Sequence, residues 1–197
     1  MITVLTLSPL AAADEFQNYD PACDGDPLYV ISPFPTEAGH WAAGRVSPDP
    51  GAGMEVTSVT YSLNIDAPAF GCRAITHRVR LFTGAEGVAP SVKPKSYVEF
   101  SVAASSLSDP DGDGDTSHTL TLATPLVVPV GQTLWVMVEQ MYTQKGVSCV
   151  AVCTTAPATP TQSYWSNSAM PLYSWSDFAS YTPDLGELMV KASGTSL

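Results

Sequence analysis

Basic residues are few in this chain of 197 residues, which contains 8 Lys and Arg against 19 Asp and Glu and has a formal net charge of −11. Nucleic-acid binding needs clustered Lys and Arg to neutralise phosphates, so the composition argues against a nucleic-acid partner. Charged residues of both signs make up only 14% of the chain, whereas apolar residues make up 45%. This balance excludes an acidic disordered chain and predicts a folded core.

Long apolar runs and known catalytic motifs are also missing. No segment approaches the ~20 consecutive apolar residues that span a bilayer, so no membrane span is expected. The sequence has no Gly-x-Ser-x-Gly, no His-Glu-x-x-His and no phosphate-binding glycine loop. His40, His77 and His118 are scattered along the chain. We therefore predict a protein that is not an enzyme, with a glycoside hydrolase or lyase using Glu99 and Glu139 as the catalytic alternative.

Helix-forming stretches are absent as well, because 17 Pro and 14 Gly interrupt short runs in which apolar and polar residues alternate. Such alternation is typical of half-buried strands. The run Thr133–Met141 is apolar on both faces, which predicts a central strand covered on each side. Eight to ten strands predict one all-β domain over residues 14–197, an antiparallel β-sandwich of jelly-roll type. The remaining strand candidates are 28–31, 41–46, 58–65, 75–81, 98–102, 118–122, 147–152, 163–165 and 187–193.

Three of these segments follow one another between residues 54 and 140: VTSVTYSL, HRVRLFTG and TLTLATPLVVPVGQTLWVMVE. In the last segment a Pro-Val-Gly-Gln turn precedes a strand that carries a Trp. This order resembles the β-sandwich modules of bacterial secreted and surface proteins. The resemblance implies an extracellular binding or structural role, by analogy of fold alone.

The start of the chain indicates export. Residues Ile2–Ala13 combine a short apolar run, a Pro and three alanines before Asp14, which is typical of the end of a signal peptide. The alternative is a first β-strand, since apolar and polar residues also alternate in this segment. The predicted location is therefore secreted, extracellular or at the cell surface, with the periplasm as a further option.

The four cysteines support the same compartment. An even number in an exported chain predicts disulfides, and the spacing does not fit a zinc site. We expect the pairs Cys23–Cys72 and Cys149–Cys153, although another pairing agrees equally well with the count.

An acidic loop is the sharpest local motif. Asp109, Asp111, Asp113 and Asp115 stand at every second position and alternate with Pro and Gly, as in calcium-binding loops. A true EF-hand is excluded, because its twelfth position is Leu120 rather than Glu. Two interpretations remain, a hairpin loop that binds Ca²⁺ and a solvated acidic turn. No other cofactor is predicted.

Aromatic residues are concentrated between residues 164 and 181, which hold six of the 18 in the chain. They alternate with Ser, Asn and Asp, and flat rings beside hydrogen-bonding groups suit sugar rings. The alternative is that these rings plug the end of the sandwich. Trp41 and Trp135 lie in strand-like runs and are expected in the core. The predicted ligand-binding residues are Tyr164, Trp165, Asn167, Tyr173, Trp175 and Asp177.

Together these features predict a non-catalytic secreted β-sandwich that binds carbohydrate or another cell-surface ligand through loops at one end. The alternative is a structural subunit of an extracellular fibre, surface layer or adhesive assembly. In that case the segment Ile2–Leu7 would complete a neighbouring subunit's sheet by β-strand complementation.

Overall fold

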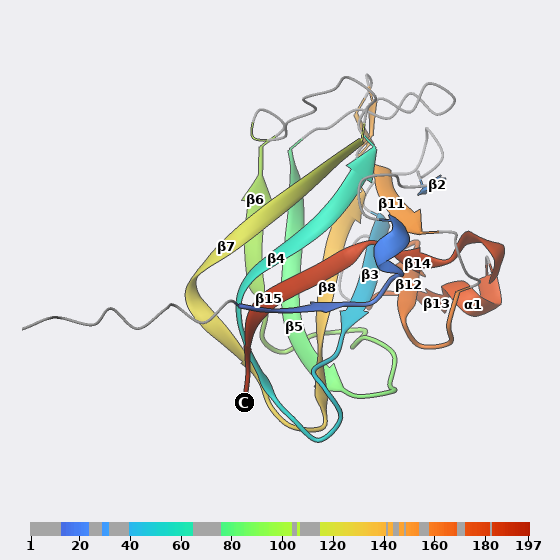
Figure 1. The fold of residues 1–197 in the computed structure, drawn as a ribbon. Coiled ribbons are helices and arrows are strands. Elements are labelled where there is room, and N and C mark those ends of the chain that lie inside the picture. The colour runs from blue at the N-terminus through green and yellow to red at the C-terminus, as the bar shows by residue number, and fades with distance from the viewer. Residues whose placement is uncertain are drawn as a thin grey trace, which may run out of the picture.

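The computed structural model contains two antiparallel β-sheets packed face to face and a separate two-stranded ribbon (Figure 1). The predicted all-β antiparallel sandwich is confirmed. Helical structure in the described residues is limited to short pieces such as α1 (Phe178–Tyr181), η1 (Pro21–Cys23) and η3 (Pro183–Leu185). No helix among them is long and apolar enough to cross a membrane. The structure describes residues 13–23, 29–31, 40–64, 76–103, 106, 115–140, 142–143, 146–147, 149–153, 158–168, 172–181 and 183–197.

Sheet A has seven strands in the order β1-β15-β4-β11-β14, with β7 also paired to β4 and β2 also paired to β11. Its strands are β1 (Asp14–Gln17), β2 (Tyr29–Ile31), β4 (Met54–Asn64), β7 (Asp115–Val128), β11 (Cys149–Cys153), β14 (Glu187–Leu188) and β15 (Val190–Ser196).

Sheet B has six strands in the order β13-β12-β3-β8-β5-β6. Its strands are β3 (His40–Val46), β5 (His77–Ala85), β6 (Val98–Val102), β8 (Gln132–Gln140), β12 (Ser163–Ser166) and β13 (Trp175–Asp177). The ribbon consists of β9 (Tyr142–Thr143) and β10 (Gly146–Val147). The described residues thus form fifteen strands rather than eight to ten, because several are pieces of two or three residues.

Strand β8 is the predicted central strand, and it lies between β3 and β5. Since side chains alternate along a strand, its residues divide between two apolar environments. Leu134, Val136 and Val138 face the core between the sheets. Trp135 and Met137 face the opposite side and belong to a second hydrophobic cluster. The apolar character of both faces of this run is therefore explained.

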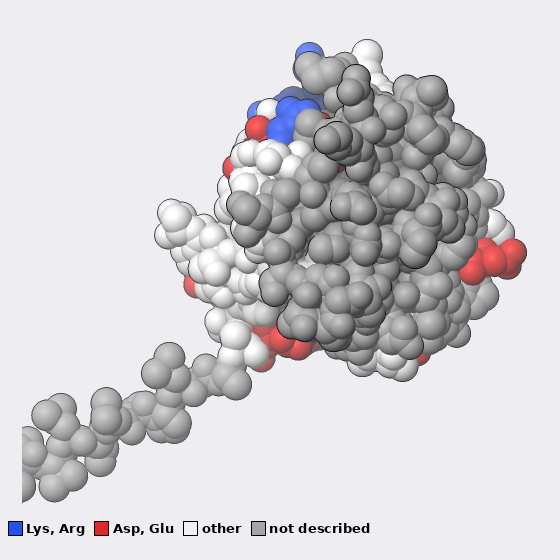
Figure 2. Space-filling model, turned by 90° about the horizontal axis from the view of Figure 1, so that it is seen from above, with Lys and Arg blue, Asp and Glu red and all other residues white. Residues whose placement is uncertain are grey.

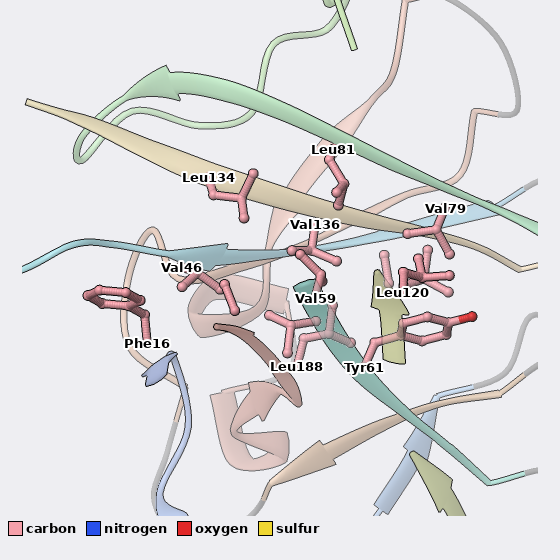
Figure 3. Close-up of a cluster of buried hydrophobic side chains, with 14 of the residues drawn as sticks. Phe16, Val46, Val59, Tyr61, Val79, Leu81, Leu120, Leu134, Val136 and Leu188 are labelled. Atoms are coloured by element: carbon pink, nitrogen blue, oxygen red, sulfur yellow. The ribbon is translucent and has the colours of Figure 1, made fainter. Parts of the chain in front are cut away.

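The main core lies between the two sheets (Figure 3). Leu81, Leu134 and Val136 from sheet B meet Val59 and Tyr61 from sheet A. Burial of each such side chain contributes roughly 1.5–3 kcal/mol, so this layer is the principal source of stability.

A disulfide joins Cys23 in η1 to Cys153 in β11, with a Cα–Cα distance of 5.7 Å. The expected pairs Cys23–Cys72 and Cys149–Cys153 are therefore wrong. Cys149 and Cys153 belong to one extended strand, in which residues four apart are separated by about 13 Å. This separation is too long for a disulfide. Cys72 lies outside the described residues.

Candidate ligand-binding face

The outer face of sheet B, turned away from sheet A, carries aromatic and charged side chains in register. Because β12, β3, β8, β5 and β6 are neighbours, their outward residues form rows across the sheet. One row consists of Ser166, Trp41, Glu139, Arg78 and Ser101. The next row consists of Tyr164, Ala43, Met137, Arg80 and Glu99.

A second hydrophobic cluster, the outer-face cluster, lies on this side of the sheet. Two connecting segments meet at it, one between β5 and β6 and one preceding β13. The Tyr173 amide donates to the Val92 carbonyl at 2.9 Å, and Trp175 Nε1 donates to the Ser91 carbonyl at 3.3 Å. The cluster consists of Trp41, Ala43, Phe82, Trp135, Met137, Tyr164 and Tyr173, with half-buried Trp175 packed against it.

Arg80 lies between two aromatic rings of this face. Its guanidinium carbon is 4.6 Å from the centroid of the Trp41 ring and 4.7 Å from that of the Tyr97 ring. Its Nε donates to Glu99 Oε2 at 2.6 Å, and its Nη1 donates to the Tyr173 hydroxyl. Stacking and hydrogen bonds together fix the plane of the guanidinium group.

The stacking continues from Trp41 to the opposite side of the face. The Trp41 and Tyr173 rings make an edge contact with centroids 5.9 Å apart, and the Tyr173 and Trp175 rings are tilted with centroids 5.1 Å apart. Tyr97, Arg80, Trp41, Tyr173 and Trp175 thus form one row, which we call the aromatic–arginine stack. Its interior is buried, whereas Tyr97 is 47% exposed and Trp175 is half-buried.

Arg78 and Glu139 form an ion pair beside the stack. Arg78 Nε donates to Glu139 Oε2 at 2.7 Å, the Arg78 amide donates to the same oxygen at 3.1 Å, and Nη2 donates to Oε1. Hydrogen bonding to buried Glu139 raises the pKa of Arg78 above its ordinary value. Arg78 and Arg80 are therefore each matched by one carboxylate, whereas Arg45, opposite Trp135 on the same face, donates to the side chains of Gln162 and Thr161. In the view onto the end of the sandwich, Lys and Arg side chains gather on one side with acidic side chains next to them (Figure 2).

Two indole N–H groups of this face have no acceptor. Nε1 of Trp41 and Nε1 of Trp135 are buried without a hydrogen-bond partner in the described part of the chain. Trp135 packs directly onto Gly84, where an added Cβ would lie 3.0 Å from the indole nitrogen. Buried donors without a partner are uncommon in folded proteins, so these two N–H groups are exceptions.

Three of the six predicted ligand-binding residues come together on this face. Tyr164 and Tyr173 are buried members of the outer-face cluster, and Trp175 packs at its margin. Burial raises the pKa of both tyrosine hydroxyls above the ordinary value, which keeps them protonated. The three residues lie over the face of a sheet, whereas the sequence predicted loops at one end of the sandwich.

The other three predicted residues have local structural partners. Trp165 points into the main core, because it follows Tyr164 in the same strand, and its Nε1 donates to Asn167 Oδ1 at 2.6 Å. Asp177 accepts the backbone amides of Thr161 at 2.8 Å and Ala179 at 2.9 Å, and so caps α1. The second Trp of the predicted platform therefore lies on the opposite side of the sheet from Trp175.

Glu99 and Glu139, the carboxylates of the catalytic alternative, lie on the same outer face with β5 between their strands. Both are engaged by arginine, Glu99 by Arg80 and Glu139 by Arg78. They lie in adjacent rows on strands two apart, about 9.6 Å across and about 6.6 Å along the sheet, so their Cα atoms are about 12 Å apart. Inverting glycosidases hold their two carboxyl groups about 6.5–9.5 Å apart.

Other predicted features lie beyond the described residues. Asp109, Asp111 and Asp113 are not described, and only the backbone of Asp115 is, as the first residue of β7. The segment 1–12 is also outside the described part, and β1 begins at Asp14. Elsewhere, the described residues contain no cluster of three or more His, Cys, Asp or Glu that could bind a metal ion. Calcium binding and the signal peptide therefore stay predictions.

Sequence reasoning missed half of this face. Tyr97, Arg78 and Arg80 were not considered for a site, whereas Trp41 and Trp135 are fully buried, as expected, in the outer-face cluster. A partial signal existed, since Arg78 and Arg80 alternate with buried Val79 and Leu81 and must point outward. The position of Tyr97 beside Arg80 depends on the return of the chain through β6, which has no local signature.

Comparisons with protein-family models, curated proteins and solved structures found no match for this chain. Inferences about its function therefore rest on the residues of the outer face of sheet B.

Proposed function

We propose that this protein binds neutral carbohydrate on the outer face of sheet B, as a non-catalytic extracellular or cell-surface protein. The aromatic–arginine stack is the observation that favours this function most. Tyr97 and Trp175 present accessible rings at its two ends. Sugar rings stack on such surfaces through their C–H faces, while their hydroxyls bond to neighbouring polar groups.

The polar groups of the face suit a neutral ligand. The carboxylates of Glu139 and Glu99 neutralise Arg78 and Arg80, so these two arginines beside the stack offer no unpaired charge to an anionic sugar. An anionic ligand would have to break one of these pairs and leave a carboxylate unpaired, which is costly near a buried surface. Hydroxyl oxygens of a neutral sugar accept from arginine without breaking either pair.

The proposed extracellular location is inferred from a separate observation. The Cys23–Cys153 disulfide favours an oxidising compartment, because such bonds are uncommon in reducing ones. A secreted or surface-exposed protein would encounter polysaccharide and glycoprotein chains there.

A glycan array with the wild-type protein, followed by calorimetric titration of the best ligand, tests the proposal. Trp175→Ala and Tyr97→Ala should each weaken binding by about tenfold or more, equivalent to ~1.4 kcal/mol. Val127→Ala is the matched control, since Val127 is 50% exposed on sheet A, away from the face. The proposal would be contradicted if the wild type bound no glycan, or if all variants bound it with equal affinity.

Hydrolysis of the bound sugar is the second candidate, favoured by the placement of Glu99 and Glu139 on one face. Incubation of the array ligand with wild type, Glu99→Gln and Glu139→Gln separates the two functions. Binding without any cleavage supports the non-catalytic function. Cleavage that both variants lose would instead identify an inverting glycosidase.

A further inference from the structure

The connection between β5 and β6 brings two lysines to the margin of the outer face of sheet B. Lys93 and Lys95 are both exposed and stand on either side of Pro94. Among the described residues, every Lys and Arg except Lys191 lies on sheet B or on this connection. The basic residues of this acidic protein are therefore concentrated on the side of the aromatic–arginine stack.

Hydrogen bonds attach the first part of this connection to one end of the stack. The carbonyls of Ser91 and Val92 accept from Trp175 Nε1 and from the Tyr173 amide. The Lys93 amide donates to Ser91 Oγ at 3.2 Å. The backbone that carries Lys93 is therefore fixed beside the Trp175 ring.

Lys95 lies close to the other accessible ring of the stack. It is two positions before Tyr97 in the chain. Backbone positions two apart are separated by at most about 7 Å, and a lysine side chain has a flexible four-carbon stem. Its ammonium group can therefore reach a ligand that stacks on Tyr97.

The two lysines differ from the arginines beside the stack, because they have no carboxylate partner. Arg78 and Arg80 are each paired with a glutamate, whereas neither lysine forms an ion pair with any described residue. Glu86 is the one acid between β5 and β6, and its amide donates to the Gly131 carbonyl at the turn between β7 and β8, at 3.2 Å. Two unpaired cationic groups thus lie at the margin of the face.

We propose that the glycan bound by this face carries an anionic substituent, a carboxylate or a sulfate ester, on a unit next to the neutral sugar that stacks on the aromatic rings. This inference rests on the proposed carbohydrate binding and specifies the class of ligand. An anion over the stack would have to displace a glutamate from its arginine, whereas an anion at the margin meets the ammonium groups of Lys93 and Lys95. The charged unit is therefore held beside the stack rather than on it.

The lysines supply preference rather than most of the affinity. An ion pair with one exposed lysine changes affinity by at most about fivefold, and salt weakens it. The formal charge of −11 does not prevent the interaction, because exposed charges farther apart than about 8 Å are largely screened at physiological salt. Only the nearby ammonium groups then distinguish an acidic glycan from a neutral one.

A glycan array tests the preference when it holds neutral oligosaccharides beside the same oligosaccharides with one uronic acid unit or one sulfate ester. At about 0.15 M salt, the wild type should bind at least one acid-bearing member about fivefold more tightly than its neutral counterpart. At about 1 M salt, this ratio of affinities should fall toward one. The two acid-bearing sets distinguish a carboxylate from a sulfate ester.

Two double variants show whether the lysines cause the preference. Lys93→Gln with Lys95→Gln should lower the ratio to about one, whereas Lys93→Arg with Lys95→Arg should retain it, because the charge is kept. Lys191→Gln makes the same change of charge on sheet A and should also retain the ratio.

The outcomes separate this inference from the proposed function. Binding of neutral glycan with a wild-type ratio of about one for every pair would overturn the inference alone. A preference that survives in the Lys93→Gln, Lys95→Gln variant would overturn it as well. Absence of binding to every glycan, neutral or acidic, would contradict the proposed function and this inference with it.

Discussion

At the scale of single residues, Tyr61 and His77 form a polar contact between the two sheets. The Tyr61 hydroxyl and His77 Nε2 are 2.7 Å apart, and both side chains are fully buried. Burial raises the pKa of Tyr61, so the hydroxyl stays protonated and is available as a donor. A buried bond of this kind fixes the register of one sheet on the other as well as adding stability.

Tyr61→Phe should therefore destabilise the fold by about 1–3 kcal/mol, because the ring nitrogen of His77 loses this partner inside the core. Urea unfolding of the two proteins measures the difference. Thr121→Val is a useful control, since that side chain is exposed at the surface of sheet A. A Tyr61→Phe protein as stable as the wild type would show that the bond contributes nothing.

Glu187 is a buried carboxyl group whose ionisation opposes folding. Ser163 Oγ donates to it at 2.7 Å, and the Thr159 amide donates to its other oxygen. Desolvation nevertheless dominates and raises the pKa of Glu187 above its ordinary value of 4.5, with nearby Asp177 adding to the effect. The folded state therefore holds this proton more tightly than the unfolded state.

The contribution of Glu187 to stability is accordingly complete below its ordinary pKa and declines as the pH rises through the raised value. Glu187→Gln removes this titration. The free energy of unfolding of the wild type, relative to this variant, should fall as the pH increases from about 4 toward 7. Urea unfolding at intervals across this range tests the sign. A difference that stayed constant or grew with pH would contradict the assignment.

At the scale of elements, alternation of apolar and polar residues was sufficient to predict the long strands. The runs 58–65, 75–81 and 133–141 correspond to β4, β5 and β8, because each strand places one side against the main core. Alternation is a local property, so it does not reveal which strands become neighbours. The pairing of β11 with β2, β4 and β14 had no signal of this kind.

Gly194 shows how closely two strands can be paired. It lies at the register shift of β15 on β4, where an added Cβ would be 1.9 Å from the Glu55 carbonyl oxygen. Gly194→Ala should cost about 3 kcal/mol or more, because backbone must move to admit the methyl group.

Gly131→Ala is the matched comparison. Its φ of 75° is strained for alanine, but nothing lies within 4 Å of the added Cβ. Strain of this type costs roughly 1–2 kcal/mol. Chemical denaturation should rank Gly194→Ala as clearly the less stable variant, and the reverse order would refute the close approach.

Some residues of the candidate site could be predicted from the local sequence, whereas others come from distant parts of the chain. The concentration of aromatics in 164–181 predicted Tyr164, Tyr173 and Trp175 as members of one ligand-binding group, and the three residues pack together in the outer-face cluster. Alternation along β12 placed Trp165 on the opposite side, which spacing in the sequence could have shown once the strand was assigned. Trp41 and Tyr97 join the stack from distant parts of the chain, so only the folded structure reveals them.

At the scale of the whole molecule, the Cys23–Cys153 disulfide ties the start of the sandwich to β11 across 130 residues. Cys23 and Cys153 also pack with Tyr19 and Met189 in a small buried cluster. A bond that closes such a long loop restricts the unfolded chain strongly.

Replacement of both cysteines, Cys23→Ala with Cys153→Ala, should lower the free energy of unfolding by about 2–4 kcal/mol. Each single replacement should cost as much as the double, since either one breaks the bond. Denaturant unfolding of the three variants provides the comparison. Single costs that sum to the double cost would mean that packing, rather than the covalent bond, supplies the stability.

Recognition of neutral sugar is proposed for the outer face of sheet B. The four indole N–H groups offer the most direct measurement, because they lie in different environments. Trp175 and Trp41 belong to the aromatic–arginine stack, whereas Trp165 points into the main core and is bonded to Asn167.

In a ¹H–¹⁵N correlation spectrum recorded during titration with the best array ligand, the indole signals of Trp175 and Trp41 should shift in a saturable manner. The signal of Trp165 should stay in place. A saturable shift of Trp165 with Trp175 and Trp41 unchanged would contradict the proposed binding face, and binding of this ligand without a shift in any of the three would contradict it as well.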